Sequence, residues 1–481
     1  MNKIKNLDLG REVLGGTLAK VVMALAGFVG TVLFARVLGP TTFGGVGIVI
    51  TLVKLFDKPM AGWGVAGKKR VSENPDDTSQ ILGAQILGNL TWLSVAALGT
   101  FLFADLVVSY TGLQRAPLFI VTLLGSVGVF STFQSLLKGH GRINLATWID
   151  TVRSYLTTPL QIGLILLGWG AGGMVFGLAL ASAALIPVTL YFLGAVPALP
   201  GRELLRSLWS YAKYSIPSTA FNHVYNRIDI LILATLMSPT AVGYYDVAWK
   251  LTLPVMFVAQ TAGSALMSKM SALDAADEAT NTDIVNTLSF SGVLAVPAFV
   301  GFLLLHTEVL VTAFGSEYTS AWPLLIGLAA YRVVATQSQP LINALNGLDR
   351  PDITMWITGT TVAGNVVLGV VLTLYYGPVG VVIATFLAEF ARYIAAIVII
   401  HREVTPFSPV SKPVVQQIAS AVVMGAGVAL TQQFVTVASW VDLGILVGVG
   451  AAVYWLVLLS ISKQLRTTLQ SAFVGMPIDL P

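Results

Sequence analysis

The feature that most constrains this chain is a series of long apolar stretches, each of about 20 residues, separated by short polar loops. An α-helix needs about 20 apolar residues to cross the hydrocarbon core of a bilayer. Charged residues make up only 10% of the chain, against about 25% in an ordinary soluble domain. The stretches are continuous rather than alternating, which excludes a transmembrane β-barrel. The sequence therefore predicts an all-α polytopic membrane protein.

Fourteen membrane-spanning helices are expected from these stretches. They cover residues 13–35, 43–66, 81–104, 116–137, 144–167, 173–194, 213–236, 242–266, 285–305, 321–346, 353–376, 379–400, 413–433 and 441–461. The second, fifth, seventh, eighth and tenth contain charge and are the weaker assignments. Prolines within the stretches, such as Pro59, Pro159, Pro217, Pro254, Pro297, Pro323 and Pro340, should kink or break the helices locally.

The basic residues fall on one side of this arrangement. With the N-terminus inside, 17 of the 27 Lys and Arg residues lie in inside loops and only Arg36 and Arg115 lie in outside loops. Cytoplasmic loops carry an excess of Lys and Arg. We therefore expect both termini to be cytoplasmic and the protein to lie in the cell membrane.

Two sequence patterns recur about 200 residues apart. RVLGPTTFG at 36–44 matches TLMSPTAVG at 235–243, and LKGHGR at 137–142, followed by Trp148, matches LNGLDR at 345–350, followed by Trp356; Gly172 then aligns with Gly380. The repeat predicts an N-lobe of six spans (1–200), a C-lobe of six spans (201–405), and two further spans with the C-terminal segment (406–481). Lobes of six spans share one orientation, as in transporters with a site between two repeats.

Charges inside spans are costly in lipid and usually face a polar cavity. Lys54 and Lys58 lie four residues apart on one helical face, which favours an anion or a carboxylate from another helix between them; the alternative is that Asp57 and water satisfy both. Arg332 has no carboxylate within its own span. The spacing of Asp150 with Arg153, of Asp246 with Lys250, and of Glu389 with Arg392 predicts ion pairs within a helix.

The seventh span is unusually polar. Arg227 and Asp229 lie two residues apart and point to nearly opposite faces of a helix, so each needs its own partner or a wet cavity. Asn222, His223, Tyr225 and Asn226 lie in the same span. We interpret these four residues as polar lining of a transport pathway.

Signatures of enzymes are weak. The chain has no cysteine, its four histidines are isolated, and no Asp-x-Asp triplet occurs. GWGAGG at 168–173 matches G-x-G-x-x-G, but no strand precedes it. The short loops leave no room for a catalytic domain, which argues against a membrane glycosyltransferase. We expect no enzymatic activity, no catalytic residue, no resident metal or cofactor and no nucleic-acid partner.

The predicted helices, the turn ARVLGPTTFG (35–44) and the charged segment NRID (226–229) together resemble the polysaccharide and oligosaccharide flippases of the multidrug/oligosaccharidyl-lipid/polysaccharide exporter superfamily. The resemblance covers essentially the whole chain. It implies two six-helix lobes in a V-shaped arrangement plus two C-terminal helices. It also implies alternating-access transport of a polyprenyl-linked sugar phosphate or pyrophosphate for surface polysaccharide or glycoprotein assembly, often coupled to an ion gradient.

This function assigns hypothetical roles to the charges. Lys54, Lys58, Arg227 and Arg332 would neutralise the phosphate, with Arg36 as an outer contact. Asp229, Asp246 or Glu389 would bind a coupling H⁺ or Na⁺. Partners would be the lipid-linked glycan, membrane lipids and a glycan polymerase or transferase. A cation-coupled multidrug antiporter and a peptidoglycan lipid-precursor flippase are the alternatives, and the net charge of +3 among the ionisable residues in spans argues against the first.

Overall fold

The computed structural model describes residues 9–274, 281–404 and 411–467, and their side chains over 27–219, 227–273, 282–402 and 411–467. All the secondary structure in these ranges is helical. The chain forms two compact units, one of residues 30–243 and the other of residues 1–29 with 244–481. The boundaries between the units fall inside two helices, α2 and α11. The lobe boundaries at 200 and 405 stay a prediction.

The unit formed by residues 30–243 begins inside the first helix and contains the helical elements that follow it up to residue 236. Its helices are α2 (Leu9–Phe56), α3 (Lys58–Glu73), η1 (Pro75–Asp77), α4 (Thr78–Leu102), α5 (Ala104–Thr111), α6 (Ala116–Leu123), η2 (Leu124–Gly128), α7 (Val129–Gly139), α8 (Ile143–Leu164), η3 (Ile165–Trp169), α9 (Ala171–Leu193) and α10 (Arg202–Leu236). Small residues let α10 pack closely on α3: Ala66 and Ala212 are fully buried with Leu208, and the Ser215 hydroxyl donates to the carbonyl oxygen of Gly62 at 2.7 Å.

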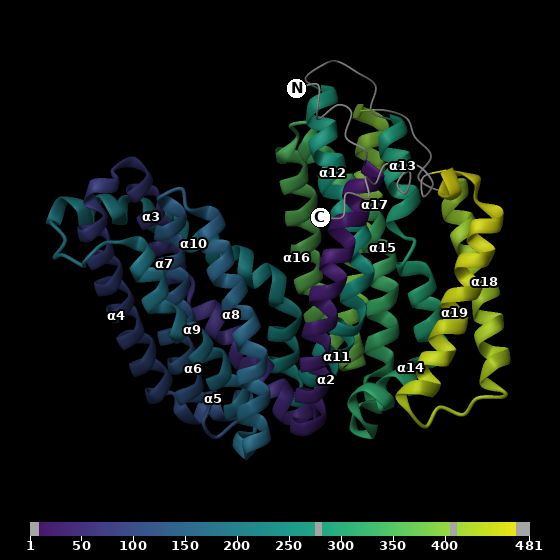
Figure 1. Ribbon diagram of the computed structural model, residues 1–481, viewed down its shortest axis with the longest axis horizontal. Coiled ribbons are helices and arrows are strands. Elements are labelled where there is room, and N and C mark those ends of the chain that lie inside the picture. The colour runs from purple at the N-terminus through teal and green to yellow at the C-terminus, as the bar shows by residue number, and fades with distance from the viewer. Residues whose placement is uncertain (1–8, 275–280, 405–410, 468–481) are drawn as a thin grey trace, which may run out of the picture. The chain divides into compact units, whose positions relative to one another are not determined.

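The second unit contains the remaining helices. They are α11 (Pro239–Thr252), η4 (Leu253–Met256), α12 (Phe257–Asp274), α13 (Asn281–Ser291), α14 (Ala295–Phe314), η5 (Ser316–Ala321), α15 (Trp322–Gly347), α16 (Pro351–Tyr376), α17 (Pro378–Ile399), η6 (Ile400–Val404), α18 (Lys412–Gln432) and α19 (Trp440–Ile461). Two neighbouring pairs, α16 with α17 and α18 with α19, run side by side (Figure 1). Buried side chains of α12, α13, α15 and α17 form one apolar core, and those of α14, α18 and α19 form another.

Helices cover all fourteen predicted spans. Ten helical segments in the described part of the chain are long and apolar enough to cross a membrane, which confirms a multi-pass all-α membrane protein. The charge-containing spans 144–167, 213–236 and 321–346 are not among them, and the segment Gly27–Phe56 covers parts of the first two predicted spans. The count of fourteen spans stays a prediction.

The seven prolines act in two ways. Pro59 and Pro323 stand in the first turn of a helix, Pro254 lies in the short turn η4, and Pro297 follows a break between two helices. At these places the missing N–H removes no bond of a regular helix. Pro159, Pro217 and Pro340 lie inside continuous helices. Prolines therefore mark four of the interruptions but do not end every helix that contains one.

The internal repeat recurs in local backbone geometry. Arg142 and Arg350 both immediately precede a helix, with ψ of 50° and 52°, at the predicted offset of 208. Gly170 and Gly377 precede the next helices, with φ of 52° and 62°, at an offset of 207. The first copy therefore holds one extra residue, and its helix ends in the π-helical turn η3. A π-turn commonly accommodates a single insertion. The equivalent of Gly380 is thus Gly173 rather than Gly172.

The other repeat forms a reciprocal contact inside the unit of residues 30–243. A Cβ built on Gly44 would lie 1.8 Å from the carbonyl oxygen of Pro239, and one built on Gly243 would lie 2.2 Å from that of Pro40. The hydroxyl oxygens of Thr41 and Thr240 lie 2.8 Å apart and share a hydrogen bond. The two matching sequences are therefore similar because they pack against each other by the same residues.

Candidate functional site

The predicted basic pair of the second span stands where α2 ends and α3 begins. Asp57 separates the two helices and is 8% exposed. Its Oδ1 lies 2.7 Å from the Lys58 Nζ, and it also interacts electrostatically with Lys54. For Lys58, the geometry thus favours the alternative in which Asp57 neutralises the basic side chain. Lys54 is exposed on the last turn of α2.

Two other predicted phosphate contacts lie on long helices of the same unit. Arg36 is exposed on α2, just before the kink at Gly39. Arg227 and Asp229 are half-buried on α10, which is helical throughout Arg202–Leu236, so the two side chains diverge as expected. The side chains of Asn222, His223, Tyr225 and Asn226 lie outside the described residues.

All three predicted ion pairs within helices are confirmed. The distance between charged atoms is 2.8 Å for Asp150 with Arg153, 2.7 Å for Asp246 with Lys250, and 2.6 Å for Glu389 with Arg392. The i,i+3 and i,i+4 spacing brings these groups together without tertiary help. Asp246 and Glu389 are both candidates for ion coupling, and each therefore already forms an ion pair with a basic side chain of its own helix.

Arg332 lies on α15 in a cage of aromatic rings. Its side chain is 4% exposed. The guanidinium carbon lies 4.0 Å from the centre of the Trp249 ring and 5.1 Å from that of Tyr331. Trp249 stacks on Tyr331 and on Tyr245, with ring centres 6.0 Å and 5.9 Å apart. Cation–π contacts stabilise a desolvated guanidinium by about 2 kcal/mol or more.

The polar atoms of this guanidinium are incompletely matched. The Arg332 Nε donates to the Thr252 hydroxyl at 3.4 Å, and its Nη2 has no hydrogen-bond partner among the described residues. No ion pair joins it to a carboxylate within those ranges. A buried donor on a charged group is costly to leave unsatisfied. The cage therefore holds a positive charge with one N–H group available to an anion.

Glu389, on α17, forms a second polar cluster with α15. The Ser338 hydroxyl donates to the Glu389 carboxylate, and the Arg392 Nη2 lies 2.6 Å from the carboxylate and 3.2 Å from the Ser338 oxygen. Arg332 also experiences the Glu389 charge. The sequence indicated the Glu389–Arg392 pair but gave no sign of Ser338.

The aromatic cage was missed by sequence reasoning. Tyr245 and Trp249 are four residues apart on α11, and Tyr331 precedes Arg332. Such spacing is common in apolar helices and identifies no cage until the helices are placed side by side. The one sequence signal that could have found the cage is the i,i+4 spacing of Tyr245 and Trp249 in a span that also contains charged residues.

The model of the family described as polysaccharide biosynthesis protein matches residues 33–323. A probable flippase, AglR, of Haloferax volcanii is 26% identical over 465 residues, which cover 94% of this chain and 96% of the relative. A probable low-salt glycan biosynthesis flippase, Agl15, of the same organism is 27% identical over 79% of this chain and 81% of that protein.

Solved structures share the fold. The lipid II flippase MurJ in an inward closed conformation has a TM-score of 0.74 at 14% identity, over 92% of this chain and 98% of that one. An inward-facing multidrug resistance transporter of the MATE family has a TM-score of 0.58 at 17% identity, over 77% of this chain and 91% of that one. This chain therefore shares the helical fold of both transporters.

Proposed function

Because this chain belongs to the polysaccharide biosynthesis protein family, we propose that it is a flippase for a polyprenyl-phosphate- or pyrophosphate-linked oligosaccharide. It would move this lipid from the cytoplasmic to the outer leaflet by alternating access. The printed names of two relatives that align over most of the chain, both flippases and one of glycan biosynthesis, support this assignment. The activity is transport, without an enzymatic step.

The observation that carries the proposal is the buried guanidinium of Arg332. A phosphate cannot enter hydrocarbon without a counter-charge, and guanidinium N–H groups match phosphate oxygens in geometry as well as charge. The available Nη2 and the surrounding rings suit an anion attached to a partly apolar lipid. We propose that Lys54, Lys58 and Arg227 also neutralise the phosphate during transport, and that Arg36 contacts it at the outer side.

The carboxylates in spans belong to the same proposal. Asp229, Asp246 and Glu389 are the candidate sites for a coupling proton or sodium ion. At Asp246 and Glu389 the ion would compete with Lys250 and Arg392. This pairing also favours an anionic over a cationic substrate, because it removes negative charge that a drug antiporter would use.

The excess of basic residues in alternate loops supports a cytoplasmic location of both termini in the plasma membrane. Delivery of a lipid-linked glycan to the outer leaflet implies glycan polymerases or transferases as functional partners. A peptidoglycan precursor has the same anionic lipid chemistry, and identification of the accumulated lipid distinguishes it from other glycans.

The test is deletion of the gene followed by extraction and mass spectrometry of lipid-linked sugars. A flippase defect leaves the donor lipid on the cytoplasmic side and removes the glycan from the cell surface. Complementation with Arg332→Ala should lower surface glycan delivery about 10- to 100-fold, the loss expected from one hydrogen bond to a charged group. Arg332→Lys keeps the positive charge but lacks the planar guanidinium with its paired N–H donors. Its surface glycan delivery should lie between that of the wild type and that of Arg332→Ala.

Arg153→Ala is the matched control, since it removes one positive charge from a helical ion pair whose carboxylate partner, Asp150, is exposed. Protein levels and thermal stability are measured for each variant. Normal delivery by well-expressed Arg332→Ala protein would contradict the role of Arg332. Unchanged lipid-linked sugars in the deletion strain would contradict the proposed function itself.

A further inference from the structure

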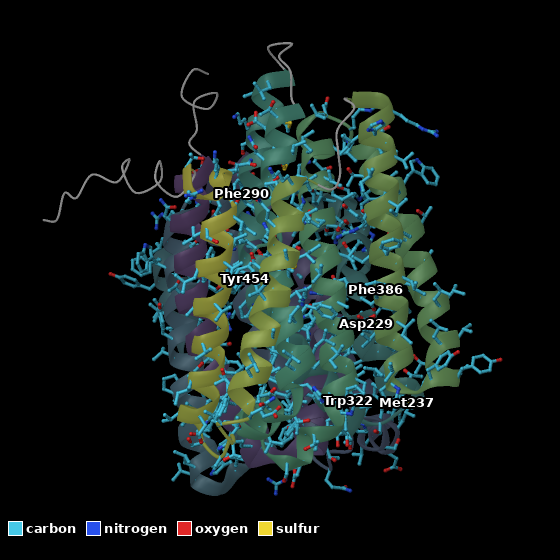
Figure 2. All side chains as sticks on the ribbon, turned by 90° about the vertical axis from the view of Figure 1, so that its right-hand side faces the viewer. Asp229, Met237, Phe290, Trp322, Phe386 and Tyr454 are labelled. Atoms are coloured by element: carbon cyan, nitrogen blue, oxygen red, sulfur yellow. The ribbon has the colours of Figure 1, made fainter. Side chains whose placement is uncertain are left out.

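The helical span 282–314 is broken in its interior. α13 ends at Ser291 and α14 begins at Ala295, with a turn between them. Pro297 has no N–H to offer the carbonyl of Val293, four residues earlier, and the Tyr454 hydroxyl of α19 donates to that carbonyl at 2.9 Å. Phe290, at the end of α13, and Tyr454 are labelled in Figure 2. Irregular backbone at membrane depth is tolerated where protein surrounds it or where it lines a cavity.

Gln417 of α18 reaches this break from one side. Its side chain is 2% exposed, and its Nε2 donates to the carbonyl oxygen of Ser289 at 2.6 Å. Because a carbonyl oxygen accepts only from a donor, this hydrogen bond identifies the amide atom that faces Ser289 as Nε2. The Gln417 Oε1 is therefore the amide atom that does not face Ser289. The Gln417 Oε1 accepts no hydrogen bond from any described residue.

Gln337 of α15 reaches the same point from the other side. A Cβ built on Gly292, in the turn, would lie 2.9 Å from the Gln337 Nε2 and 3.4 Å from the Gln417 Oε1. The two amide groups thus converge on the bare Cα of Gly292. The Gln337 Oε1 is also buried without a partner in the described part of the chain. The final torsion of a Gln side chain is broad, so the Gln337 amide can turn its Oε1 instead of its Nε2 toward the glycine.

The surroundings explain why these oxygens need a ligand. Val293, beside Gly292, and Ala421, one turn after Gln417, belong with Val296 and Met424 to one apolar cluster, and a buried acceptor without a donor is destabilising. The carbonyl groups at the C-terminal end of α13 add a partial negative charge. In membrane transporters, neutral carbonyl oxygens and the ends of broken helices commonly bind Na⁺.

We propose that Gln337, Gln417 and the C-terminal end of α13 form a site for a monovalent metal cation such as Na⁺. The ligands are uncharged oxygens, which suit a single positive charge. The described residues contain no group of three or more His, Cys, Asp and Glu that could hold a metal, which fits a monovalent rather than a divalent ion. The proposal concerns ion binding alone and does not depend on which glycan is transported.

The experiment measures thermal unfolding of purified full-length protein in detergent, in NaCl, KCl and choline chloride at equal ionic strength. A ligand of the folded state raises the melting temperature in a saturable way. We expect NaCl or KCl to stabilise the wild-type protein relative to choline chloride. Binding of ²²Na⁺ to the same protein gives an independent readout.

Three variants locate the effect. Gly292→Ala places a methyl group between the two amides, and Gln337→Leu removes one oxygen; each should weaken the apparent cation affinity at least about tenfold. Gly301→Ala on α14 is the matched control, because a Cβ there meets no atom within 4 Å.

Equal melting temperatures in all three salts would overturn the proposal. Cation stabilisation that persists unchanged in both Gly292→Ala and Gln337→Leu would place the ion elsewhere and would also overturn it. If one of these variants fails to fold, the other still decides the question.

Discussion

The contact between Gly44 and Pro239 yields a quantitative prediction. In Gly44→Ala, the new Cβ would lie 1.8 Å from the Pro239 carbonyl oxygen. Heavy atoms of this kind do not approach closer than about 3 Å, so the two backbones must separate by more than about 1 Å. A carbonyl oxygen of a helix cannot swing aside as the end of a flexible side chain would.

The cost follows from what the separation disrupts. The Thr41–Thr240 hydrogen bond, 2.8 Å long and three residues away, would be lost, at about 1 kcal/mol. Overpacking of a tight contact costs a further ~1–3 kcal/mol. We therefore expect Gly44→Ala to lower the free energy of unfolding by about 2–4 kcal/mol.

The assay is thermal unfolding of the purified protein, followed by circular dichroism. Gly47→Ala is the control one turn along the same helix, because its Cβ would meet Val242 at an ordinary 3.8 Å. Gly243→Ala should be nearly as harmful as Gly44→Ala, since its Cβ would lie 2.2 Å from the Pro40 oxygen. The double variant should cost much less than the sum, because the first substitution has already opened the contact.

Equal melting temperatures for Gly44→Ala and Gly47→Ala would refute this reasoning. So would additive effects of Gly44→Ala and Gly243→Ala, which would mean that the two glycines act in separate contacts.

Two further predictions concern charged groups. Glu389→Gln leaves the Arg392 guanidinium without its carboxylate and should destabilise the protein by about 3–5 kcal/mol. Adding Arg392→Gln should restore part of the lost stability. A double variant that is no more stable than Glu389→Gln in thermal unfolding would count against the stabilising role of the ion pair. Burial, and less strongly Arg142, lower the pKa of His140 below its usual 6.5. The unfolded chain then binds the proton more readily, so stability is complete above about pH 6.5 and declines as the pH falls. Melting temperatures from about pH 8 to pH 5.5 should decline less steeply in His140→Gln than in the wild type, and parallel curves would exclude this role.

Much of the fold follows from the sequence alone. Each of the fourteen apolar stretches lies in a helical region, because burial of apolar side chains in lipid depends on length and composition, which are local properties. The three ion pairs, such as Asp246 with Lys250, were predictable for the same reason, because helical spacing brings the partners together.

The repeats were visible in the sequence, but their physical meaning was not. Matching residues 199 apart could reflect symmetry, contact or both, and only the structure shows Gly44 and Gly243 against each other's prolines. The offset of 207 after η3 could likewise be recognised only from the π-helical turn in the structure. In the sequence, Gly172 and Gly173 are equally good matches for Gly380.

The sequence by itself determined that this chain is a multi-pass helical membrane protein with few charges in its spans. Only the tertiary structure decided which of these charges are satisfied: Asp57 neutralises Lys58, whereas Arg332 contacts aromatic rings of α11 and, among the described residues, forms no ion pair with a carboxylate. It also brought Gln337 and Gln417 to Gly292. Satisfaction of a buried polar group depends on atoms from helices far apart in the chain, and no local pattern encodes their approach.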